Sequence, residues 1–523
     1  MGDDPFSANE RRQEIQETLA PRLISEPLKS KIDQELSITE AQRAKAFPPL
    51  TANLYEVIIE LNLNNSEGRA GVREAIFSML RDTLGGNSAE ALRRNREDST
   101  HPYVFATLTA QQIVALVARD GDRAADIEKA AAQHTGPPST RKTRRAIFRV
   151  WESQKIHPLT TESVRTVKAN AAHSSFGAFG EGIVWAVLDS GVDDNHPHFK
   201  LHDNLTLAAP LTGRSSSFTP VATPWNLDAF GHGTHVAGII AGESDPAMVP
   251  QAAIQSADPE GGGEYHLRPV VAIKAMAPRA KLLILRVLDD NGDGDETALI
   301  QAIEYIQQLN DFGRHLVVHG VNISAGFPAH PTWYASGQTP LCVEVNRLVK
   351  SGVVVVVAAG NSGHVITFLT PISTMEAGQV LSINDPGNAE FAITVGSTHR
   401  ESPHTYGISY FSSKGPTSDG RRKPEVVAPG EKIISAASAQ RPANATLPGL
   451  KGAHFDYIED TGTSMAAPHV SGVIAAFLSV KREFIGQPEN VKDLLMKSAM
   501  DLGRDTNFQG AGLVDLMKLI QSV

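Results

Sequence analysis

Cysteine and long apolar runs are scarce in this sequence. Cys342 is the only cysteine among 523 residues, which excludes a disulfide bond within the chain. The most apolar run, residues 353–359, is far shorter than the roughly 20 residues that a bilayer-spanning helix needs. We therefore expect no membrane partner.

The N-terminal segment lacks the features of a targeting signal. Its first 50 residues contain no apolar core of a signal peptide. Myristoylation of Gly2 would need Ser or Thr at position 6, and the nearest serine is Ser7. These absences predict a cytoplasmic protein, or a secreted one only if residues ahead of Met1 are missing from the sequence.

An excess of basic residues is also absent. The formal net charge of −10 argues against a nucleic-acid partner, which would call for a basic surface. With 41% hydrophobic and 20% charged residues, the composition is ordinary for a soluble globular enzyme. The length allows two domains, each with its own core.

The most informative segment, residues 462–470, reads GTSMAAPHV. Ser464 opens an apolar stretch that predicts a buried helix as far as Val480. The amino end of a helix offers unpaired N–H groups and the positive end of the dipole, which suit a developing anion. A serine becomes a good nucleophile only with a base and a group that orients the base.

Candidates for both partners precede this serine. Residues 184–188 form an apolar run that predicts a buried strand, and Asp189 follows at its carboxyl end. Active sites of open α/β sheets are built at that edge. His232 lies between glycines at the start of a small-residue helical pattern. The order along the chain is therefore Asp, His, Ser.

Four spaced motifs resemble those of the subtilisin-like serine proteases, the subtilase family. They are LDSGV at 188–192, HGTHVAG at 232–238, VAAGN at 357–361 and GTSMAAP at 462–468. The resemblance covers roughly residues 163–523. It implies an α/β fold with a doubly wound, mainly parallel sheet, and a serine endopeptidase that works through an acyl-enzyme.

The resemblance also assigns roles to single residues. Ser464 would attack the scissile carbonyl, His232 would take and return the proton, and Asp189 would orient the imidazole. The side-chain amide of Asn361 would donate to the oxyanion beside the Ser464 N–H group. The Thr463 hydroxyl would add a further contact to the same oxyanion.

Each candidate also has an ordinary interpretation. An aspartate at a strand end is usually a turn former or a cap. His232 and His235, three apart on one helix face, could be packed side chains or metal ligands. Asn361 could be a turn residue and Ser464 an N-cap. Four motifs in the family's order favour catalysis for all of these except His235, for which we predict a structural role.

Three segments are expected to bind substrate. Residues 288–296 take the place of a subtilase edge strand that pairs with extended substrate, and residues 324–326 and 358–360 would form the opposite wall. The predicted binding residues are Gly292, Asp293, Gly294, Ser324, Ala325, Gly326, Ala358, Ala359 and Gly360. Five carboxylates in 288–296 suggest a preference for Lys or Arg in substrates, with a solvated turn as the alternative.

No cofactor is required for the expected chemistry, and metal ligands cannot be assigned. Many subtilases bind structural calcium near the first motif and in the helix after the histidine. Here His198 replaces an expected carboxylate, and residues 243–270 form an insertion, so the familiar calcium site is doubtful. Residues 289–294 match half of an EF-hand loop, but Ile300 stands at its twelfth position.

The region ahead of the peptidase predicts a separate small domain. Residues 1–48 suggest a helical arm. Within 49–160 we expect strands at 54–61, 103–108 and 146–151 and helices at 70–84 and 110–119, an α+β unit of ferredoxin-like type. The pattern resembles the inhibitory propeptide of subtilases, which would make this domain an intramolecular inhibitor. An unrelated accessory domain is the alternative.

A propeptide implies self-cleavage, which we expect within residues 152–163. The basic cluster at 141–145 is a rival processing site or a solvated loop. Insertions at 327–340, 364–382 and 438–456 are too irregular to interpret. A dedicated processing protease, an exopeptidase and a silent binding scaffold are the alternatives to a general endopeptidase.

Overall fold

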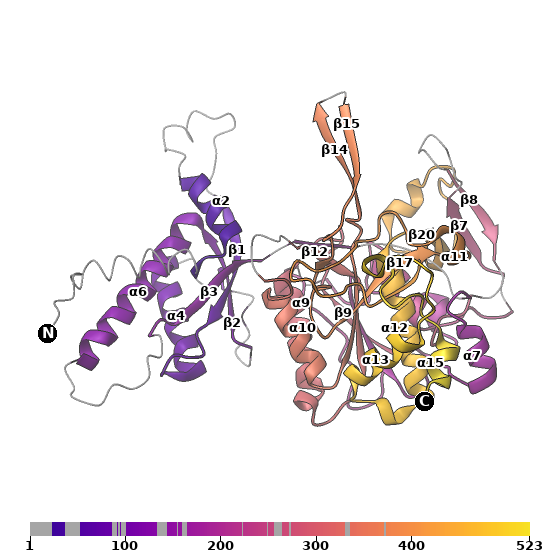
Figure 1. The fold of residues 1–523 in the computed structure, drawn as a ribbon, viewed down its shortest axis with the longest axis horizontal. Coiled ribbons are helices and arrows are strands. Elements are labelled where there is room, and N and C mark those ends of the chain that lie inside the picture. Colours follow the sequence, from indigo (N-terminus) through magenta and orange to yellow (C-terminus); the bar gives the residue numbers. More distant parts are fainter. Residues whose placement is uncertain are drawn as a thin grey trace. The chain divides into compact units, whose positions relative to one another are not determined.

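A computed structural model describes most of the chain. The described residues are 23–36, 53–85, 91–92, 95, 101–132, 144–153, 155–158, 165–221, 223–247, 249–255, 264–270, 273–329, 335–370 and 373–523. The chain divides into two compact units, residues 1–154 and 155–523 (Figure 1). This division lies a few residues before the predicted domain end at 160.

The N-terminal unit contains a three-stranded antiparallel sheet of order β2-β1-β3. Its strands are β1 (Leu54–Leu61), β2 (Tyr103–Thr109) and β3 (Ile147–Glu152), and its helices include α4 (Gly68–Leu84) and α6 (Ala110–Ala132). Each of these elements was predicted, although α6 continues well past the predicted end. A ferredoxin-like topology has a fourth strand and stays a prediction.

A further helix, α2 (Glu26–Leu36), falls within the predicted arm. Its Leu28 and Ile32 side chains are buried in the same core as Val57 of β1 and Val150 of β3. The Glu35 carboxylate accepts a hydrogen bond of 2.7 Å from the Tyr55 hydroxyl. The described part of the arm therefore belongs to the N-terminal unit, and the remainder lies outside the described residues.

The second unit is built on a seven-stranded sheet. The order is β18 (Val426–Glu431), β17 (Ile393–His399), β13 (Val354–Ala358), β11 (Gly320–Ile323), β5 (Val184–Asp189), β9 (Lys281–Arg286) and β6 (Ser216–Ser217). All six pairings in this sheet are parallel. This confirms the predicted α/β class.

Both faces of the sheet are covered. Trp185, Val187 and Val356 share one core with helices α8 (His232–Ile240) and α12 (Thr463–Val480). Residues of the opposite parity, such as Leu188 and Val357, are also buried. Helices α9 (Glu296–Leu309) and α10 (Pro340–Lys350) pack together, and α10 contacts β13 (Figure 1).

Helix α12 has the length and composition of a membrane span, the only such helix among the residues that the structure describes. It is almost entirely buried, and it contacts β11, β13, β17, β18 and α8. Its position in the core accounts for its apolar sequence.

Two of the predicted insertions meet in a second sheet. Its strands lie in the order β19 (Ile433–Ala436), β20 (Tyr457–Asp460), β7 (Gln251–Gln255) and β8 (Tyr265–Pro269) (Figure 1). We call it the insertion sheet. Strands β7 and β8 lie within 243–270, and residues 438–456 connect β19 to β20. The sheet has a small core of its own that includes Ala253, Phe455 and Ile458.

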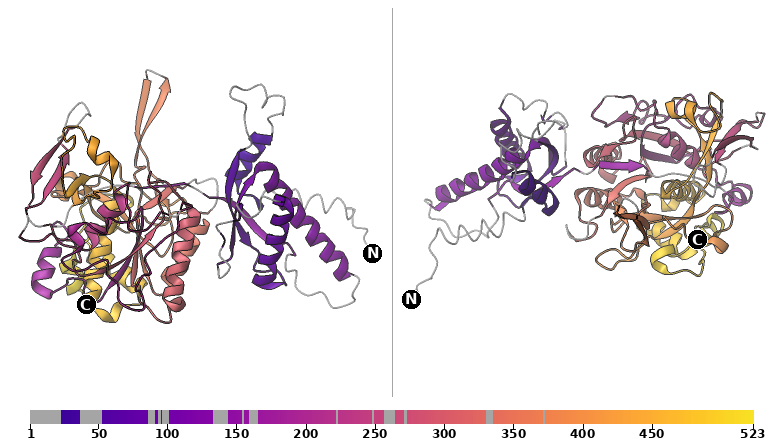
Figure 2. Two further views of the ribbon diagram at one scale, coloured as in Figure 1. Left: turned by 180° about the vertical axis from the view of Figure 1, so that it is seen from behind. Right: turned by 90° about the horizontal axis from the view of Figure 1, so that it is seen from above.

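The insertion at 364–382 also has regular structure. It contains the antiparallel hairpin of β14 (His364–Thr370) and β15 (Ser373–Gly378), which projects from the unit in Figures 1 and 2. The hairpin begins three residues after Asn361. The sequence of residues 364–382 looked irregular, but the segment forms a regular hairpin.

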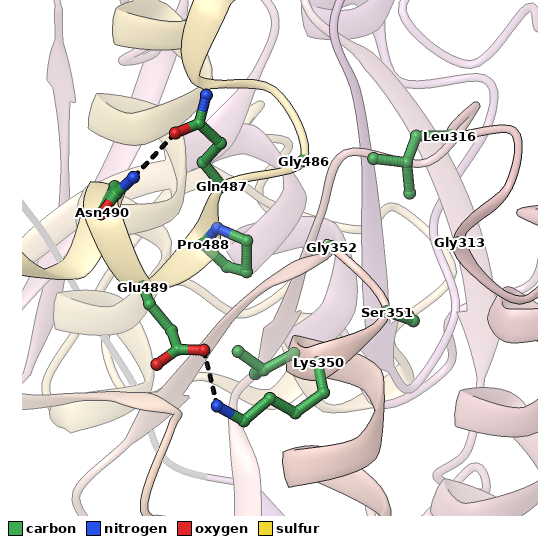
Figure 3. A pocket seen from close by; sticks show the side chains of 11 residues that line it. Gly313, Leu316, Lys350, Ser351, Gly352, Gly486, Gln487, Pro488, Glu489 and Asn490 are labelled. Atoms are coloured by element: carbon green, nitrogen blue, oxygen red, sulfur yellow. Dashed lines mark hydrogen bonds and ion pairs between the residues drawn. The ribbon is translucent and has the colours of Figure 1, made fainter.

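The amino edge of the parallel sheet carries a surface pocket of about 650 Å³ (Figure 3). Gly352, which precedes β13, and Gly486 are among its lining residues. The Lys350 ammonium group beside it pairs with the Glu489 carboxylate at 2.6 Å. Because Asn361 follows β13 at the other end, this pocket is separate from the predicted active site.

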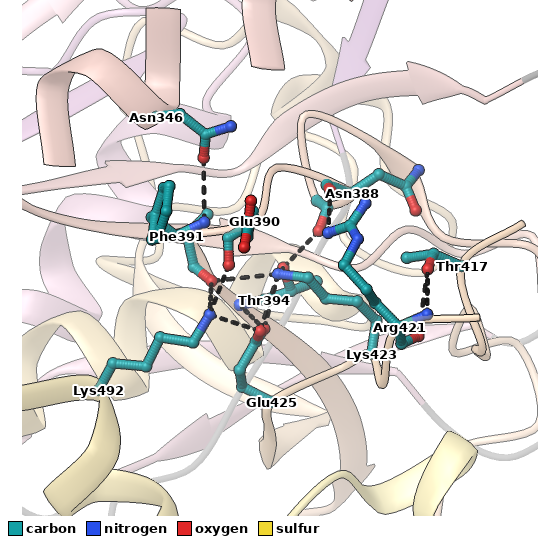
Figure 4. A network of polar contacts seen from close by, with 12 residues as sticks. Asn346, Asn388, Glu390, Phe391, Thr394, Thr417, Arg421, Lys423, Glu425 and Lys492 are labelled. Carbon is teal, nitrogen blue, oxygen red and sulfur yellow. Dashed lines mark hydrogen bonds and ion pairs between the residues drawn. The ribbon is translucent and has the colours of Figure 1, made fainter. Parts of the chain in front are cut away.

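The same edge holds a buried charge cluster at the start of β18 (Figure 4). The Lys423 ammonium group donates to the Glu425 carboxylate and the Thr394 hydroxyl, both at 2.9 Å. Burial lowers the pKa of Lys423 to about 7. Burial opposes ionisation of Glu425, but Lys423 and Lys492 hold its pKa below the usual value. The cluster links β17, β18 and α13 (Pro488–Ser498), which suggests a structural role.

Candidate active site

The predicted catalytic residues meet at the carboxyl edge of the parallel sheet. Asp189 is the last residue of β5, and Ser324 directly follows the neighbouring strand β11. Asn361 follows β13, which pairs with β11 on its other side. The strand order therefore brings side chains together that are far apart in the sequence.

Asp189 and His232 form a buried pair. The Asp189 Oδ1 atom lies 2.6 Å from His232 Nδ1, and both residues are at most 3% exposed. The Ser190 N–H group also donates to Asp189 Oδ1, at 2.8 Å. Such a short contact with a carboxylate requires a proton on Nδ1, which leaves Nε2 as the basic nitrogen.

Two glycines permit this close approach. Gly231 is the N-cap of α8 with φ of +87°, a conformation that favours glycine. A Cβ atom on Gly233 would lie 2.1 Å from the Gly191 carbonyl oxygen and 3.2 Å from Asp189 Cβ. The glycines that flank His232 therefore let the first turn of α8 pack directly on the segment after β5.

Ser464 lies in the first turn of α12 and is fully buried. Its hydroxyl donates to the Ser324 carbonyl at 2.9 Å, and the Ser324 hydroxyl donates to the Ser464 carbonyl at 2.7 Å. In the adjoining pair of strands, Ile323 is opposite Leu188, the residue before Asp189. These contacts hold Ser464 at the strand end next to the aspartate–histidine pair.

Asn361 is oriented by Thr463. Its Oδ1 atom accepts hydrogen bonds from the Thr463 N–H group and hydroxyl, both at 3.0 Å. Because the oxygen is engaged in this way, the amide nitrogen is the end that faces away from Thr463. The Thr463 hydroxyl also accepts from the Gly360 N–H group at 3.1 Å. We predicted that the Thr463 hydroxyl contacts the oxyanion. The geometry favours a different role, in which this hydroxyl positions Asn361.

His235 lies in the position expected of a structural residue, as predicted. Its Nε2 atom lies 3.1 Å from the Ile458 carbonyl oxygen of β20. Burial, with His232 nearby, lowers the pKa of His235 to about 3. A neutral imidazole fixed to the insertion sheet does not act as a base near neutral pH.

Asp228 is a residue of this site that the sequence analysis missed. Its fully buried carboxylate accepts from the Ser190 hydroxyl and the Gly231 N–H group, both at 2.8 Å. It also accepts from the Thr234 N–H group at 2.8 Å and the Thr234 hydroxyl at 2.6 Å. An acid shortly before a glycine-flanked helix start was the available signal, because acids often cap helices. The carboxylate ties the first turn of α8 to Ser190, next to Asp189.

The predicted substrate segments lie on either side of an extended strand of the chain itself. A four-stranded sheet has the order β10 (Gly294–Asp295), β4 (Lys155–Pro158), β12 (Ala325–Pro328) and β16 (Asn384–Asp385). In β4, Ile156 is opposite Gly294, whereas His157 and Pro158 are opposite Gly326 and Ala325, all in antiparallel pairing. The structure thus brings the predicted edge and wall together around one extended segment.

The remaining predicted wall residues adjoin a residue that was not predicted. The Ala359 carbonyl accepts from the Asn384 N–H group at 2.9 Å. A Cβ atom on Gly360, whose φ is +108°, would lie 2.6 Å from Asn384 Cγ. Asn384 therefore lies against the predicted pocket wall. It comes two residues after the insertion at 364–382, and no pattern in the sequence marked it.

The acidic segment carries less charge than its sequence suggested. The Asp290 carboxylate pairs with the buried Arg286 guanidinium at 2.6 Å, and Asp295 caps α9. Burial raises the pKa of Glu296 to about 8, so this acid is mostly protonated at neutral pH. The segment therefore carries fewer than five net negative charges, and the preference for basic substrates stays a prediction.

His198, which replaces an expected calcium ligand, is held by other groups of the protein. The buried His198 ring places Nε2 at 3.0 Å from the Gly238 carbonyl oxygen and Nδ1 at 3.1 Å from the Tyr457 hydroxyl. Burial lowers the pKa of His198 to about 3. Across the described ranges, no group of three or more His, Cys, Asp or Glu residues could hold a metal ion.

An aspartate-bound histidine next to a serine, at the carboxyl edge of a parallel sheet, is an arrangement found in serine hydrolases. The sequence model of the Subtilase family matches residues 180–512. Because this is more than half of the chain, the chain belongs to the subtilase family. It is a subtilisin-like serine endopeptidase with protein or peptide substrates.

Individual relatives agree with this family. Subtilisin E of Bacillus subtilis (strain 168) is 29% identical over 358 residues, which cover 68% of this chain and 70% of that protein. Serine protease AprX of the same organism is 30% identical over 344 residues, or 64% and 65% of the two chains. Its Major intracellular serine protease is 32% identical over 324 residues, or 62% and 76%.

Proposed function

We propose that Asp189, His232 and Ser464 are the catalytic triad of this peptidase. The observation that carries the proposal is the buried contact of 2.6 Å between Asp189 Oδ1 and His232 Nδ1. It lies beside a serine held at the end of the adjoining strand. This geometry argues against a silent scaffold, because a binding protein would not need the histidine tautomer to be fixed.

In the proposed reaction, the Ser464 hydroxyl turns from the Ser324 carbonyl and gives its proton to His232 Nε2. The Ser464 oxygen bonds to the scissile carbonyl carbon, and the carbonyl electrons move to its oxygen. The C–N bond then breaks, and the His232 proton leaves with the amine. Water repeats the sequence on the acyl-enzyme and releases the acid.

The oxyanion that forms in each half of the reaction needs donors. We assign this role to the Asn361 amide nitrogen and the Ser464 N–H group at the start of α12. The two Thr463 contacts to Asn361 Oδ1 support the assignment, since they set the direction of the amide. Donors fixed before the reaction stabilise the transition state without reorganisation.

We also propose that the chain is a zymogen that cleaves itself after β4. In β12, Ser324 precedes Ala325, the partner of Pro158. The Ser324 carbonyl accepts from the Ser464 hydroxyl, so the described end of β4 is paired one residue along the chain from the group that holds the proposed nucleophile. We therefore place the cleaved bond just after β4, between Leu159 and Thr160, within the predicted window of 152–163.

The rival site at 141–145 has less support. Residues 141–143 lie outside the described residues, but the Arg144 and Arg145 carbonyls each accept from Asn65 Nδ2 at 3.0 Å. Arg145 O also accepts from Asn62 Nδ2 at 3.0 Å. A peptide segment held in this way does not readily enter a protease cleft as an extended strand.

Self-cleavage makes a direct prediction about mass. Purified wild-type protein is expected to yield a chain that begins at Thr160, whereas Ser464→Ala keeps all 523 residues. Intact mass and N-terminal sequencing would be followed together with peptidase activity. If the N-terminal unit is an inhibitor, activity rises as the full-length chain disappears. Full activity from an unprocessed chain, or a new terminus outside 152–163, would reject this proposal.

We propose that the peptidase does not depend on calcium at the familiar position. The His198 ring nitrogen already contacts the Gly238 carbonyl oxygen there, and a side chain in this position takes the place of a carboxylate ligand. Addition of excess EDTA is expected to shift the thermal midpoint by less than about 2 °C, which for a domain of this size corresponds to at most roughly 1.5 kcal/mol. A large drop that calcium restores in the wild type would contradict this proposal.

We propose a cytoplasmic location. The likeness to the Major intracellular serine protease of Bacillus subtilis supports it. Fractionation of cells that express the full chain from its own promoter would test the location. Processed protein found only outside the cytoplasm would contradict it.

A further inference from the structure

The loop between β19 and β20 holds the backbone of Asp228. The Gln440 Oε1 atom accepts from the Asp228 N–H group at 2.6 Å, and the Ser438 hydroxyl donates to the Asp228 carbonyl at 2.7 Å. Asp228 is thus fixed at its carboxylate by the first turn of α8 and at its main chain by residues 438–440. We call residues 438–456 the insertion loop.

The same loop also reaches the segment after Asp189. The Ala439 N–H group donates to Asp193 Oδ2 at 3.0 Å, and Gln440 Nε2 donates to Asp193 Oδ1 at 3.3 Å. The Asp193 N–H group in turn donates to the Thr234 hydroxyl of α8 at 2.9 Å. The insertion loop therefore contacts both segments that carry the aspartate–histidine pair.

Packing adds a further constraint at the start of α8. A Cβ atom on Gly231 would lie 2.9 Å from Arg441 Cδ, so the loop rests against the N-cap of the helix. The loop itself is anchored, because Leu450 and Phe455 are buried in the core of the insertion sheet. The Asn444 side-chain amide donates to the Ser438 carbonyl at 2.8 Å and stiffens the loop where it meets Asp228.

We infer that the insertion loop is a positioning element for catalysis, in which Gln440 and Asp228 keep His232 in register with Asp189. The inference rests on the proposed triad and extends it. The side-chain hydrogen bonds of Gln440 are to Asp228, Asp193 and Asn226, so it acts through Asp228 on the first turn of α8. The insertion thereby has a role in turnover.

The test is Gln440→Met, which keeps the approximate shape of the side chain but removes its hydrogen bonds to Asp228 and Asp193. The matched control is Gln255→Met, at an exposed end of β7 in the insertion sheet. A short blocked peptide substrate would give kcat and KM across pH, and thermal unfolding would be measured on the same samples. The wild type and both variants are compared as processed proteins.

We expect Gln440→Met to lower kcat about ten- to a hundredfold, because small displacements of catalytic groups have effects of this size. KM should change less than about threefold, since β10 and β12 keep their geometry. The acidic limb of the kcat/KM profile should move to lower pH, because a looser Asp189 stabilises the imidazolium less. Gln255→Met should match the wild type in all of these.

The outcomes separate the two proposals. An active wild type with an unchanged kcat and acidic limb in Gln440→Met overturns the positioning role, even if the variant is less stable. A wild type that is processed by other means but hydrolyses no peptide overturns the triad and this inference together. Ser438→Ala provides a second variant on the same Asp228 carbonyl and is expected to shift the acidic limb in the same direction.

Discussion

Replacement of Ser464 by alanine is expected to lower kcat/KM by roughly a millionfold, the scale seen when the nucleophile of subtilisin is removed. The proposed mechanism has no other atom that can bond to the scissile carbonyl in this position. The residual rate would come from substrate binding and from the oxyanion donors. Hydrolysis of a blocked fluorogenic peptide by processed enzyme would measure the effect.

A serine on the same helix provides the control. Ser479 lies near the end of α12, where its hydroxyl donates to the Ala476 carbonyl at 2.7 Å. Ser479→Ala should retain nearly all peptidase activity. Because Ser464→Ala cannot process itself, its N-terminal unit must be removed by a second protease before the comparison. A loss of less than about a thousandfold in Ser464→Ala would point to a different nucleophile.

Asn361→Asp is expected to lower kcat about a hundred- to a thousandfold while KM changes little. The aspartate can still accept from the Thr463 N–H group and hydroxyl, so the local fold should be preserved. It lacks the amide donor, and its charge opposes the oxyanion. The expected size is that of removing one oxyanion donor from a subtilisin-type site.

The comparison with Thr463→Val separates donation from positioning. Valine removes the hydroxyl contact to Asn361 Oδ1 but leaves the N–H contact, so we expect a smaller loss, about tenfold. If Asn361→Asp kept wild-type kcat, Asn361 would be a structural turn residue. Peptide kinetics with substrate at saturation would decide this, because the effect is confined to kcat.

The sheet and the catalytic positions could be predicted where the sequence has a local signal. Residues 184–188 and 353–359 are continuous apolar runs, and the structure has the buried strands β5 and β13 there. Asp189, His232 and Ser464 each stand beside small residues that mark strand ends and helix starts. The parallel arrangement of β5, β11 and β13 then places them at one edge.

Other features depend on contacts between distant segments. In the insertion sheet, Tyr457 of β20 pairs with Ala252 of β7, about two hundred residues earlier in the chain. No pattern within either segment announces this partner. The role of Asp228 likewise depends on Ser438 and Gln440, which an isolated sequence motif cannot reveal.

Charge and helix length show two further limits of the sequence. The carboxylates of Asp290 and Glu296 count equally in the sequence, but one is paired with Arg286 and burial keeps the other mostly protonated. Helix α6 extends to Ala132 because alanine, arginine and glutamate favour helix even where no apolar stripe is present. Periodicity alone gave an end at Arg119.

We propose that Ser464 is the nucleophile of a self-processed serine peptidase. The most direct measurement is covalent labelling with a fluorophosphonate, followed by intact mass and peptide mapping of the wild type and of Ser464→Ala. We predict a single label on Ser464 in a chain that begins at Thr160, and no label on the variant. A label on another serine, or none on a chain that has lost its N-terminal unit, would contradict the account.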